Sequence, residues 1–550
     1  MVRETTPLHP VVSSETSWTA MRLIRFAAMR VAIGWLGLLT TWALVQPATG
    51  AAHAEQVERY YRMELGGQPA GWVVETTTVS EGLWVTETHT RMELRRAGTA
   101  TSMEMFSRFE ETAEHQPVSG MTRQALGSAP LVTTFRFDDE TVQVQEPGGA
   151  TRRHDLGKRT WMTPVETSEH VIRQIRRAYD EPGSTDFAFE VRRLELLVGV
   201  EPVTGRYVLQ DPDDPIEIDG RRRETGRWAM SESYAPLLTT LAWIDRDGVL
   251  LRSEADMMGM KMVMSLTDDD PRDDLASDEE RSAQLPELLV QTFVRPDRPI
   301  EASRDLRRGV FRLQVQDLDV ASLRQVVPTA GVQHVRPDGT RDALLVEVDL
   351  DRQIGESVLE DREIFLRPTR YLDFEHDAVQ RLIESWRRST RPVEPPGDAA
   401  GRSEALRRFV GRHLSDKNLG TVLGSASDTA TNGSGDCTEH AVLLAALLRA
   451  EGIPSRVAVG LVYAEEFAGE NDLFAYHMWT QAWLGVEGGS SWVDLDATLP
   501  DATPFDATHI LFATSPLAEE GVPLLGTGVE AIFGRLSIEV VSPGPANPRS

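Results

Sequence analysis

The chain contains a single cysteine, Cys437, within the segment Gly-Asp-Cys-Thr-Glu-His-Ala at residues 435–441. One thiol cannot form an internal disulfide, and the neighbouring sequence offers few partners for a metal ion. The pattern therefore favours a thiolate that is kept for its reactivity. The alternative is a small buried residue that happens to carry sulfur.

A cysteine nucleophile needs a base and a third group that fixes the tautomer of that base. His477 lies in the strand-like segment 475–486, and Asp494 and Asp496 follow in the strand-like segment 491–498. Side chains alternate along a strand, so both aspartates are expected on one face, and alternation alone does not choose between them. His440 is a rival base, but on the same helix as Cys437 we expect it to pack beneath the site or to bond a loop carbonyl.

A helix is predicted to position the thiol. Asp436 is a typical N-cap, and Glu439 completes a capping box, so Cys437 occupies the first helical position. The sulfur is then expected near backbone N–H groups and the positive end of the helix dipole, which favour a thiolate. Apolar residues recur at helical spacing from 442 to 450, and Gly452 with Pro454 ends the helix.

Four motifs in this order resemble the transglutaminase-like superfamily. They are residues 435–441, residues 452–457, His477-x-Trp479, and Trp492-x-x-x-Asp496-x-Thr498. The resemblance covers roughly residues 370–515 and implies a papain-like core. By the same resemblance Cys437 is the nucleophile, His477 the general base and later acid, and Asp496 the residue that orients the imidazole. Ala497 replaces the usual proline and Met478 a more usual alanine; neither change removes a reacting group.

The implied reaction is acyl transfer from a protein or peptide amide. The thiolate attacks the carbonyl, His477 protonates the departing amine, and a thioester remains. Water as the second substrate gives a peptidase, amidase or deamidase, whereas an amine gives a transglutaminase, and both stay open. The backbone N–H of Cys437 is one expected oxyanion donor. The mechanism requires no metal and no cofactor.

The N-terminal residues predict export. Residues 1–54 contain a basic segment, a short apolar stretch over 31–45 and two small residues separated by one residue at 52–54. This order is typical of a secretory signal peptide. The sequence therefore indicates an exported bacterial protein of the periplasm or the extracellular space. An uncleaved N-terminal anchor is the alternative.

Composition limits the partners. The formal net charge is −28 at pH 7, which disfavours binding to nucleic acid phosphates. Proteins or peptides are the expected substrates, and association with the cell envelope is compatible with export. The sequence does not give the oligomeric state.

The predicted fold class is α+β with several domains. After the leader come an antiparallel β-rich domain at 55–267, with a helix over 168–179, and an acidic linker at 268–290. A small β-sandwich-like domain at 291–368 precedes the catalytic domain at 369–515 and a C-terminal extension at 516–550. In the catalytic domain, amphipathic helices are expected at 378–388 and 402–414. The linker lacks the glycine of a calcium loop, which argues against Ca²⁺ binding.

Two further hypotheses concern other parts of the chain. Met258, Met260, Met262 and Met264 alternate, so one strand face carries thioethers that could pack in a core, hold Cu(I) or line a lipid groove. A non-catalytic envelope scaffold that keeps the fold is the alternative to an enzyme. An intact triad favours the enzyme, because a scaffold does not need all three groups.

Overall fold

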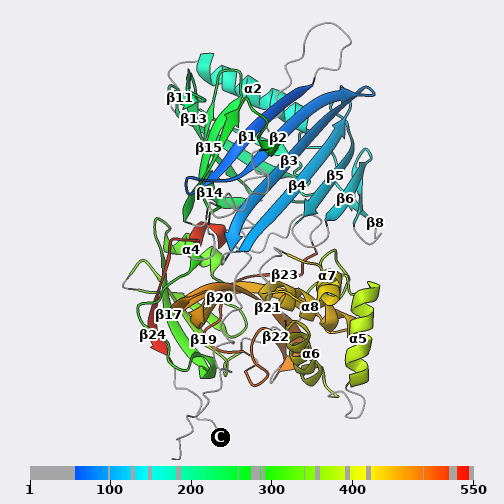
Figure 1. The fold of residues 1–550 in the computed structure, drawn as a ribbon, viewed down its shortest axis with the longest axis vertical. Helices are drawn as coiled ribbons and strands as arrows, with labels where there is room; N and C mark the ends of the chain where they lie inside the picture. Colours follow the sequence, from blue (N-terminus) through cyan, green and yellow to red (C-terminus); the bar gives the residue numbers. More distant parts are fainter. Residues whose placement is uncertain are drawn as a thin grey trace, which may run out of the picture.

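The computed structural model describes residues 56–543, apart from 97–98, 126–129, 147–150, 181–186, 258, 274–284, 287–291, 340, 354–358, 390–396, 416–422, 487–488, 504 and 519–528. The predicted leader at 1–54, part of the acidic linker and the tail beyond 543 lie outside the described residues. Figure 1 shows a large sheet in one half of the molecule and a smaller α+β assembly in the other. The fold class predicted from the sequence is confirmed.

Within its described residues, the N-terminal half contains a large antiparallel sheet of 14 strands. The order is β8-β7-β6-β5-β4-β3-β2-β1-β16-β15-β14-β13-β10-β9, so the first strand pairs with the last strand of this region. Its strands are β1 Val57–Leu65, β2 Gln68–Ser80, β3 Leu83–Arg96, β4 Thr99–Glu111, β5 Pro117–Ala125, β6 Leu131–Phe137, β7 Thr141–Gln145, β8 Thr151–Asp155, β9 Ala188–Arg193, β10 Val203–Asp211, β13 Gly226–Glu232, β14 Ala235–Ile244, β15 Leu250–Met257 and β16 Met260–Thr267.

Helix α2, Pro164–Asp180, covers part of this sheet, and its buried side chains include Val171 and Ile175. The helix expected over 168–179 is therefore confirmed, with one more turn at its start. A separate two-stranded sheet pairs β11, Ile216–Ile218, with β12, Arg221–Arg223.

The alternating methionines belong to the core of the large sheet. Met262 and Met264 are fully buried, and Met264 lies opposite Met63 on β1. Met260 is partly buried against the same apolar cluster, and Met258 lies outside the described residues. The core interpretation is thus confirmed for Met262 and Met264.

The same sheet carries a row of polar residues that face one another across five strands. Glu75 lies opposite Thr88, and the row continues through Ser107 and Thr122 to Thr133. Glu75, Thr88, Thr122 and Thr133 are buried, with Thr122 and Thr133 at most 1 % exposed, and Ser107 is partly buried.

A four-stranded sheet follows, in the order β18-β19-β17-β24. Its elements are β17 Arg308–Val315, α4 Val320–Val326, β18 Gln333–Pro337, β19 Leu344–Asp349 and β24 Leu536–Pro543. β24 comes from the predicted C-terminal extension and pairs with β17. The sequence did not predict this pairing, which brings both sides of the catalytic segment into one small sheet.

The segment predicted to be the catalytic domain, residues 369–515, combines four helices, among its described residues, with a sheet in the order β22-β21-β20-β23. Its elements are α5 Asp377–Ser389, α6 Ala399–His413, α7 Ala426–Asn432, α8 Cys437–Ala450, β20 Ser455–Phe467, β21 Glu470–Val486, β22 Gly489–Leu495 and β23 Ile510–Ser515. The remaining short 3-10 helices are η1 Pro271–Asp273, η3 Ser303–Asp305, η4 Arg362–Phe365 and η5 Val529–Ile532.

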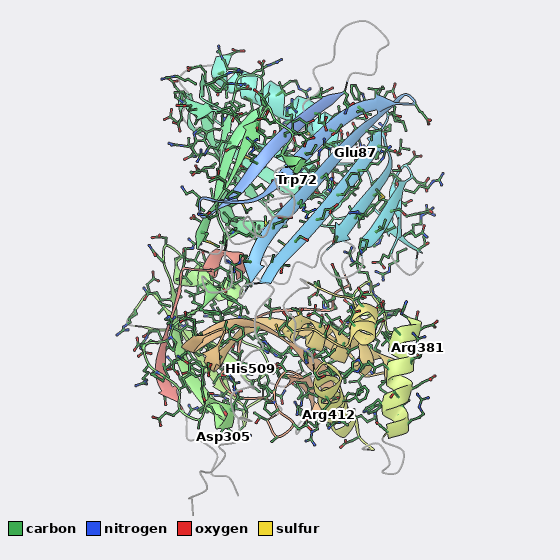
Figure 2. All side chains as sticks on the ribbon, viewed as in Figure 1. Trp72, Glu87, Asp305, Arg381, Arg412 and His509 are labelled. Atoms are coloured by element: carbon green, nitrogen blue, oxygen red, sulfur yellow. The ribbon has the colours of Figure 1, made fainter. Side chains whose placement is uncertain are left out.

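Helix α8 is the centre of this assembly. It packs against β20 and β21 on one side and against α5, α6 and α7 on the other, and all but its last residue are buried. Arg381 on α5 and Arg412 on α6 are solvent-facing, whereas His509, just before β23, is enclosed (Figure 2). Within the described part of the chain, helices of the length and apolarity that a membrane crossing demands are absent.

Candidate active site

Helix α8 begins at Cys437, as the capping pattern predicted. The Asp436 Oδ1 atom accepts the backbone N–H of Thr438 at 3.0 Å and the Thr438 hydroxyl at 2.9 Å. The Asp436 N–H donates to Glu439 Oε2 at 3.0 Å, which closes the capping box. These bonds fix the backbone on both sides of the thiol, and Cys437 itself is 1 % exposed.

The turn before Cys437 requires glycine at position 435. Gly435 has φ +156°, and a Cβ added there would lie 2.4 Å from the Cβ of Glu439. The same glutamate accepts the backbone N–H of Gly424 through Oε1 at 3.2 Å. Glu439 therefore connects two loops to the first turn of α8, and a side chain at 435 would displace it.

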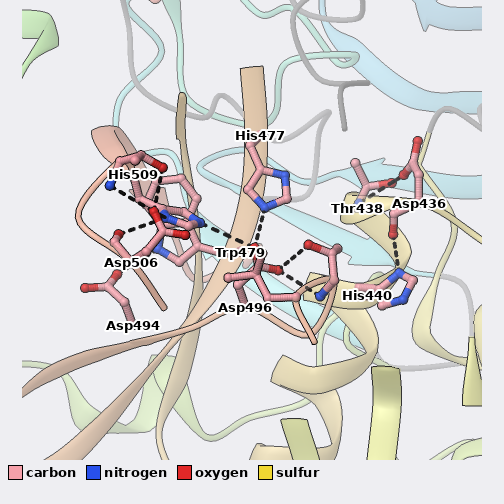
Figure 3. A network of polar contacts seen from close by, with 12 residues as sticks. Asp436, Thr438, His440, His477, Trp479, Asp494, Asp496, Asp506 and His509 are labelled. Atoms are coloured by element: carbon pink, nitrogen blue, oxygen red, sulfur yellow. Dashed lines mark hydrogen bonds and ion pairs between the residues drawn. The ribbon is translucent and has the colours of Figure 1, made fainter. Parts of the chain in front are cut away.

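His477 and Asp496 are in direct contact. His477 Nε2 and Asp496 Oδ2 are 2.8 Å apart, and both side chains are at most 1 % exposed (Figure 3). His477 Nδ1 is buried and has no hydrogen-bond partner among the described residues. With Asp496 accepting at Nε2–H, the neutral ring carries its lone pair on Nδ1.

Asp494 contacts different residues. Its Oδ1 accepts the indole N–H of Trp479 and the side-chain amide of Gln481, each at 2.7 Å. The prediction of a strand through residue 498 is wrong, because β22 ends at Leu495 and Asp496 begins a turn. Because Asp496 lies outside the strand, its side chain does not have to lie on the same face as that of Asp494, as the alternation had predicted.

The strand of His477 is fixed against the helix of Cys437. The Thr480 hydroxyl on β21 donates a hydrogen bond to the carbonyl of Ala441, one turn after Cys437, at 3.0 Å. In the view of Figure 3 the His477 ring lies above Asp496, and Asp436 and Thr438, which flank Cys437, lie to the right of both. The rival base His440 bonds the Asp436 carbonyl through Nδ1 at 2.6 Å, which holds its ring within its own helix start.

Residues 387–497 match the transglutaminase-like superfamily. The matched segment contains Cys437, His477 and Asp496, so the resemblance drawn from their motifs is confirmed for this part of the chain. A search of curated proteins finds no match.

Two solved structures are similar to parts of the chain. One is a β-barrel-like protein of a domain of unknown function from Brucella abortus, with 10% identity and a TM-score of 0.28, covering 39% of this chain and 95% of that one. The other is described as a "Putative Cysteine Protease" from Cytophaga hutchinsonii, with 17% identity and a TM-score of 0.23, covering 42% of this chain and 81% of that one.

Within the transglutaminase-like segment, Asp496 is held by neighbours on each of its oxygen atoms. Oδ1 accepts the Thr498 N–H at 2.8 Å and the Thr498 hydroxyl at 2.7 Å. The backbone carbonyl of Asp496 accepts a hydrogen bond from Nη1 of the buried Arg407 guanidinium at 3.1 Å. Burial opposes the charge of the carboxylate, but the two histidines at Oδ2, His477 and His509, lower the pKa of Asp496 well below its usual value.

The pKa of His477 is lowered, and burial is the main cause because it disfavours the imidazolium. Asp496 opposes this shift through its charge and hydrogen bond, whereas the charges of His509 and Arg304 add to it. His477 is therefore neutral at neutral pH, which is the form that can accept a proton.

Sequence reasoning missed His509. Its Nε2 atom lies 3.3 Å from Asp496 Oδ2, and its Nδ1 atom lies 3.0 Å from the carbonyl of Asp506. A signal was present: Asp-Ala-Thr occurs three times, at 496–498, 501–503 and 506–508. In the first and third copies the aspartate Oδ1 accepts the N–H and the hydroxyl of the threonine two residues later. These two copies thus form similar turns around one site.

Among the described residues, His477, Asp496 and His509 are the group whose ligand atoms could hold a metal, since these atoms lie within 4.8 Å of one another. The separations of 2.8 and 3.3 Å at Asp496 Oδ2 are those of hydrogen bonds between the same atoms. A metal ion would have to replace both bonds.

Proposed function

We propose that Cys437, His477 and Asp496 form the catalytic triad of an enzyme that cleaves or exchanges amide bonds of proteins or peptides. The observation that carries the proposal is the 2.8 Å contact between His477 and Asp496, which leaves His477 Nδ1 without a partner among the described residues. The helix whose first residue is Cys437 packs against the strand of His477. The family match over residues 387–497 supports the same chemistry.

In the proposed first step, His477 Nδ1 accepts the proton of the Cys437 thiol, and Asp496 stabilises the imidazolium through Nε2–H. The sulfur electron pair forms a bond to the amide carbon, and the carbonyl π electrons move onto the oxygen. The backbone N–H at the start of α8 is proposed as one oxyanion donor. The imidazolium then gives its proton to the departing nitrogen as the C–N bond breaks, which leaves a thioester.

In the second step a nucleophile releases the acyl group. His477 accepts a proton from water or from a primary amine, the nucleophile adds to the thioester carbon, and the Cys437 sulfur leaves with the proton. Water yields a carboxylic acid and makes the enzyme a peptidase, amidase or deamidase. An amine yields a new amide and makes it a transglutaminase.

We also propose that the enzyme acts outside the cytoplasm. This proposal rests on the signal-like sequence of residues 1–54 and on the presence of one cysteine, which removes the need to form disulfides during export. Localisation of a C-terminally tagged chain in cell fractions tests it, since retention of all tagged protein in the cytoplasm would contradict export.

The triad is tested with a library of peptides that contain glutamine, asparagine and cleavable backbone amides, with and without a fluorescent primary amine. Mass spectrometry separates deamidation, chain cleavage and amine incorporation. We expect one of these products from the native protein and none from Cys437→Ser or His477→Ala. Product formation that survives both substitutions would overturn the triad and would favour the scaffold alternative with a contaminating activity.

A further inference from the structure

We infer that His509 is a positioning residue of the proposed triad, a doubly protonated imidazole that shares Asp496 Oδ2 with His477 and holds the carboxylate in place. The inference rests on the proposed function, because His477 and Asp496 are its reference points. No motif of the transglutaminase-like match includes His509, which lies beyond residue 497.

The partners of its ring fix the protonation state of His509. Nε2 faces Asp496 Oδ2 at 3.3 Å, and Nδ1 faces the Asp506 carbonyl at 3.0 Å with Asp506 Oδ1 at 3.4 Å. An ionised carboxylate and a carbonyl can only accept hydrogen bonds. Both ring nitrogens must therefore carry hydrogen, which makes the ring an imidazolium.

The surroundings stabilise this buried cation. The Phe505 ring lies 4.1 Å from the His509 ring, and the Trp479 ring lies 5.3 Å away in an edge-to-face arrangement. Burial by itself would lower the pKa of His509, but the charges and hydrogen bonds of Asp506 and Asp496 outweigh it and raise the pKa to about 9. Cation–π contact with the two rings acts in the same direction.

Other charged groups lie near His509. Asp506 forms an ion pair with Arg304, which also donates to the carbonyl of Tyr463. Asp494 lies close enough for the charge of His509 to favour its ionised form. The titratable and charged groups around His509 are therefore five. The carboxylates of Asp496 and Asp506 contact its ring, and the carboxylate of Asp494, the imidazole of His477 and the guanidinium of Arg304 lie further away.

Two effects on the triad follow from this arrangement. With Thr498 at Oδ1 and two imidazoles at Oδ2, the carboxylate of Asp496 cannot rotate without losing hydrogen bonds. In addition, the positive charge of His509 opposes protonation of His477. His509 therefore adds to the effect of burial, which keeps His477 in its neutral form, and it fixes the carboxylate that orients His477.

The test uses the full-length protein labelled with ¹³C at the histidine Cε1 positions and follows the ring signals against pH by NMR. In the native protein we expect one imidazole to stay doubly protonated at pH 7.5 and to disappear in His509→Gln. The midpoint at which His477 loses its proton should move to higher pH in the variant. His170→Gln removes a histidine that lies beside an aromatic ring in the N-terminal sheet, and we expect it to leave this midpoint unchanged.

Turnover provides the second readout. If an amide substrate has been found, we expect kcat of His509→Gln to fall about tenfold to a hundredfold with a smaller change in KM, because the imidazole of His477 is misplaced. A His477 midpoint equal to that of the native protein would overturn the inference, as would a neutral His509 ring in the native protein at pH 7.5. The latter measurement needs no variant and so stands even if His509→Gln does not fold.

The two proposals fail in different ways. If the rate of Cys437 alkylation is the same in the native protein and in His477→Ala, the triad is contradicted, whatever the protonation state of His509. Alkylation that depends on His477, together with an unchanged His477 midpoint in His509→Gln, would overturn the role of His509 and leave the triad in place. Asp506→Asn removes one carboxylate beside His509, and we expect the His509 ring to lose its second proton at lower pH in this variant.

Discussion

Glu75 in the N-terminal sheet and Asp496 in the catalytic segment are both buried carboxyl groups, and their surroundings are opposite. Glu75 is 2 % exposed, and its Oε2 has no hydrogen-bond partner among the described residues. Burial raises its pKa to about 8, and the charge of Arg59 only partly opposes this. Asp496 is equally buried, but its carboxylate takes part in four hydrogen bonds, and the charges and hydrogen bonds of two of these partners, His477 and His509, lower its pKa.

The difference extends to the hydroxyl groups of the two regions. In the large sheet, the hydroxyls of Thr122 and Thr133 are buried without partners among the described residues, whereas those of Thr498 and Thr508 bond aspartates. A buried charge is tolerated only where hydrogen bonds replace water. The transglutaminase-like segment provides such partners around Asp496, so it can keep a charged carboxylate in its interior, whereas the large sheet keeps Glu75 neutral.

The largest expected effect concerns the charged carboxylate. Asp496→Asn should lower kcat on the order of 10⁴-fold, because an amide that donates to His477 Nε2 places the ring proton on Nδ1 and removes the base. Asp494→Asn is the matched control, since Asp494 contacts Trp479 and Gln481 and not His477. We expect Asp494→Asn to lower kcat by less than about tenfold. Amide turnover measures both, and an equal loss in the two variants would remove the distinction between these aspartates.

The second prediction compares two neighbouring arginines on α6. Arg407 is fully buried and donates to the carbonyls of Asp496 and Asp501 as well as to Glu404, whereas the half-exposed Arg408 pairs, among the described residues, with Glu404. Arg407→Met should lower the free energy of unfolding by about 3–5 kcal/mol, since it leaves buried acceptors unpaired. Arg408→Met should lower the free energy of unfolding by less than about 1 kcal/mol. Urea denaturation at pH 7 compares them, and similar losses would contradict the role given to Arg407.

The third prediction concerns pH and Glu75. Because its folded pKa of about 8 lies above the ordinary value of 4.5, its contribution to stability is complete below pH 4.5 and is lost as pH rises through 8. Each unit of this shift corresponds to about 1.4 kcal/mol. Glu75→Gln should therefore unfold with a higher free energy than the native protein at pH 8 and with nearly the same free energy at pH 4.5. A variant that is less stable at both pH values would show that the carboxyl group has a partner that stabilises it.

The smallest effects are expected from two threonine substitutions. Thr133→Val removes a hydroxyl that has no partner among the described residues, so stability should stay within about 1 kcal/mol or rise. Thr508→Val removes a hydroxyl that bonds Asp506 and should cost about 1–2 kcal/mol. Thermal and urea unfolding compare the pair. A larger loss in Thr133→Val would indicate that the polar row of the large sheet binds water or another molecule.

Much of the catalytic segment could be predicted because local chemistry defines it. The start of α8 at Cys437 follows from Asp436 and Glu439, and its end follows from the glycine and proline that come after it. These signals lie within a few residues of the features that they determine. The large antiparallel sheet followed in the same way from alternation along its strands.

Other features could not be predicted because distant segments determine them. The pairing of β24 with β17 joins residues more than 200 positions apart, and no local pattern specifies such a partner. Strand alternation could not choose Asp496 over Asp494, because the choice depends on where β22 ends and strand boundaries are weakly marked in sequence; only the motif resemblance pointed to Asp496. The ion pair between Arg304 and Asp506 behind His509 likewise exists only once the chain has folded.

The central claim is that His477 activates Cys437, and the rate of alkylation by iodoacetamide as a function of pH tests it most directly. The site of modification is unambiguous, because the chain has one cysteine. We predict that the native protein reacts at neutral and mildly acidic pH, where an ordinary thiol is protonated, and that His477→Ala shifts the whole profile to alkaline pH. Identical profiles for the native protein and His477→Ala, both following an ordinary thiol, would contradict the claim.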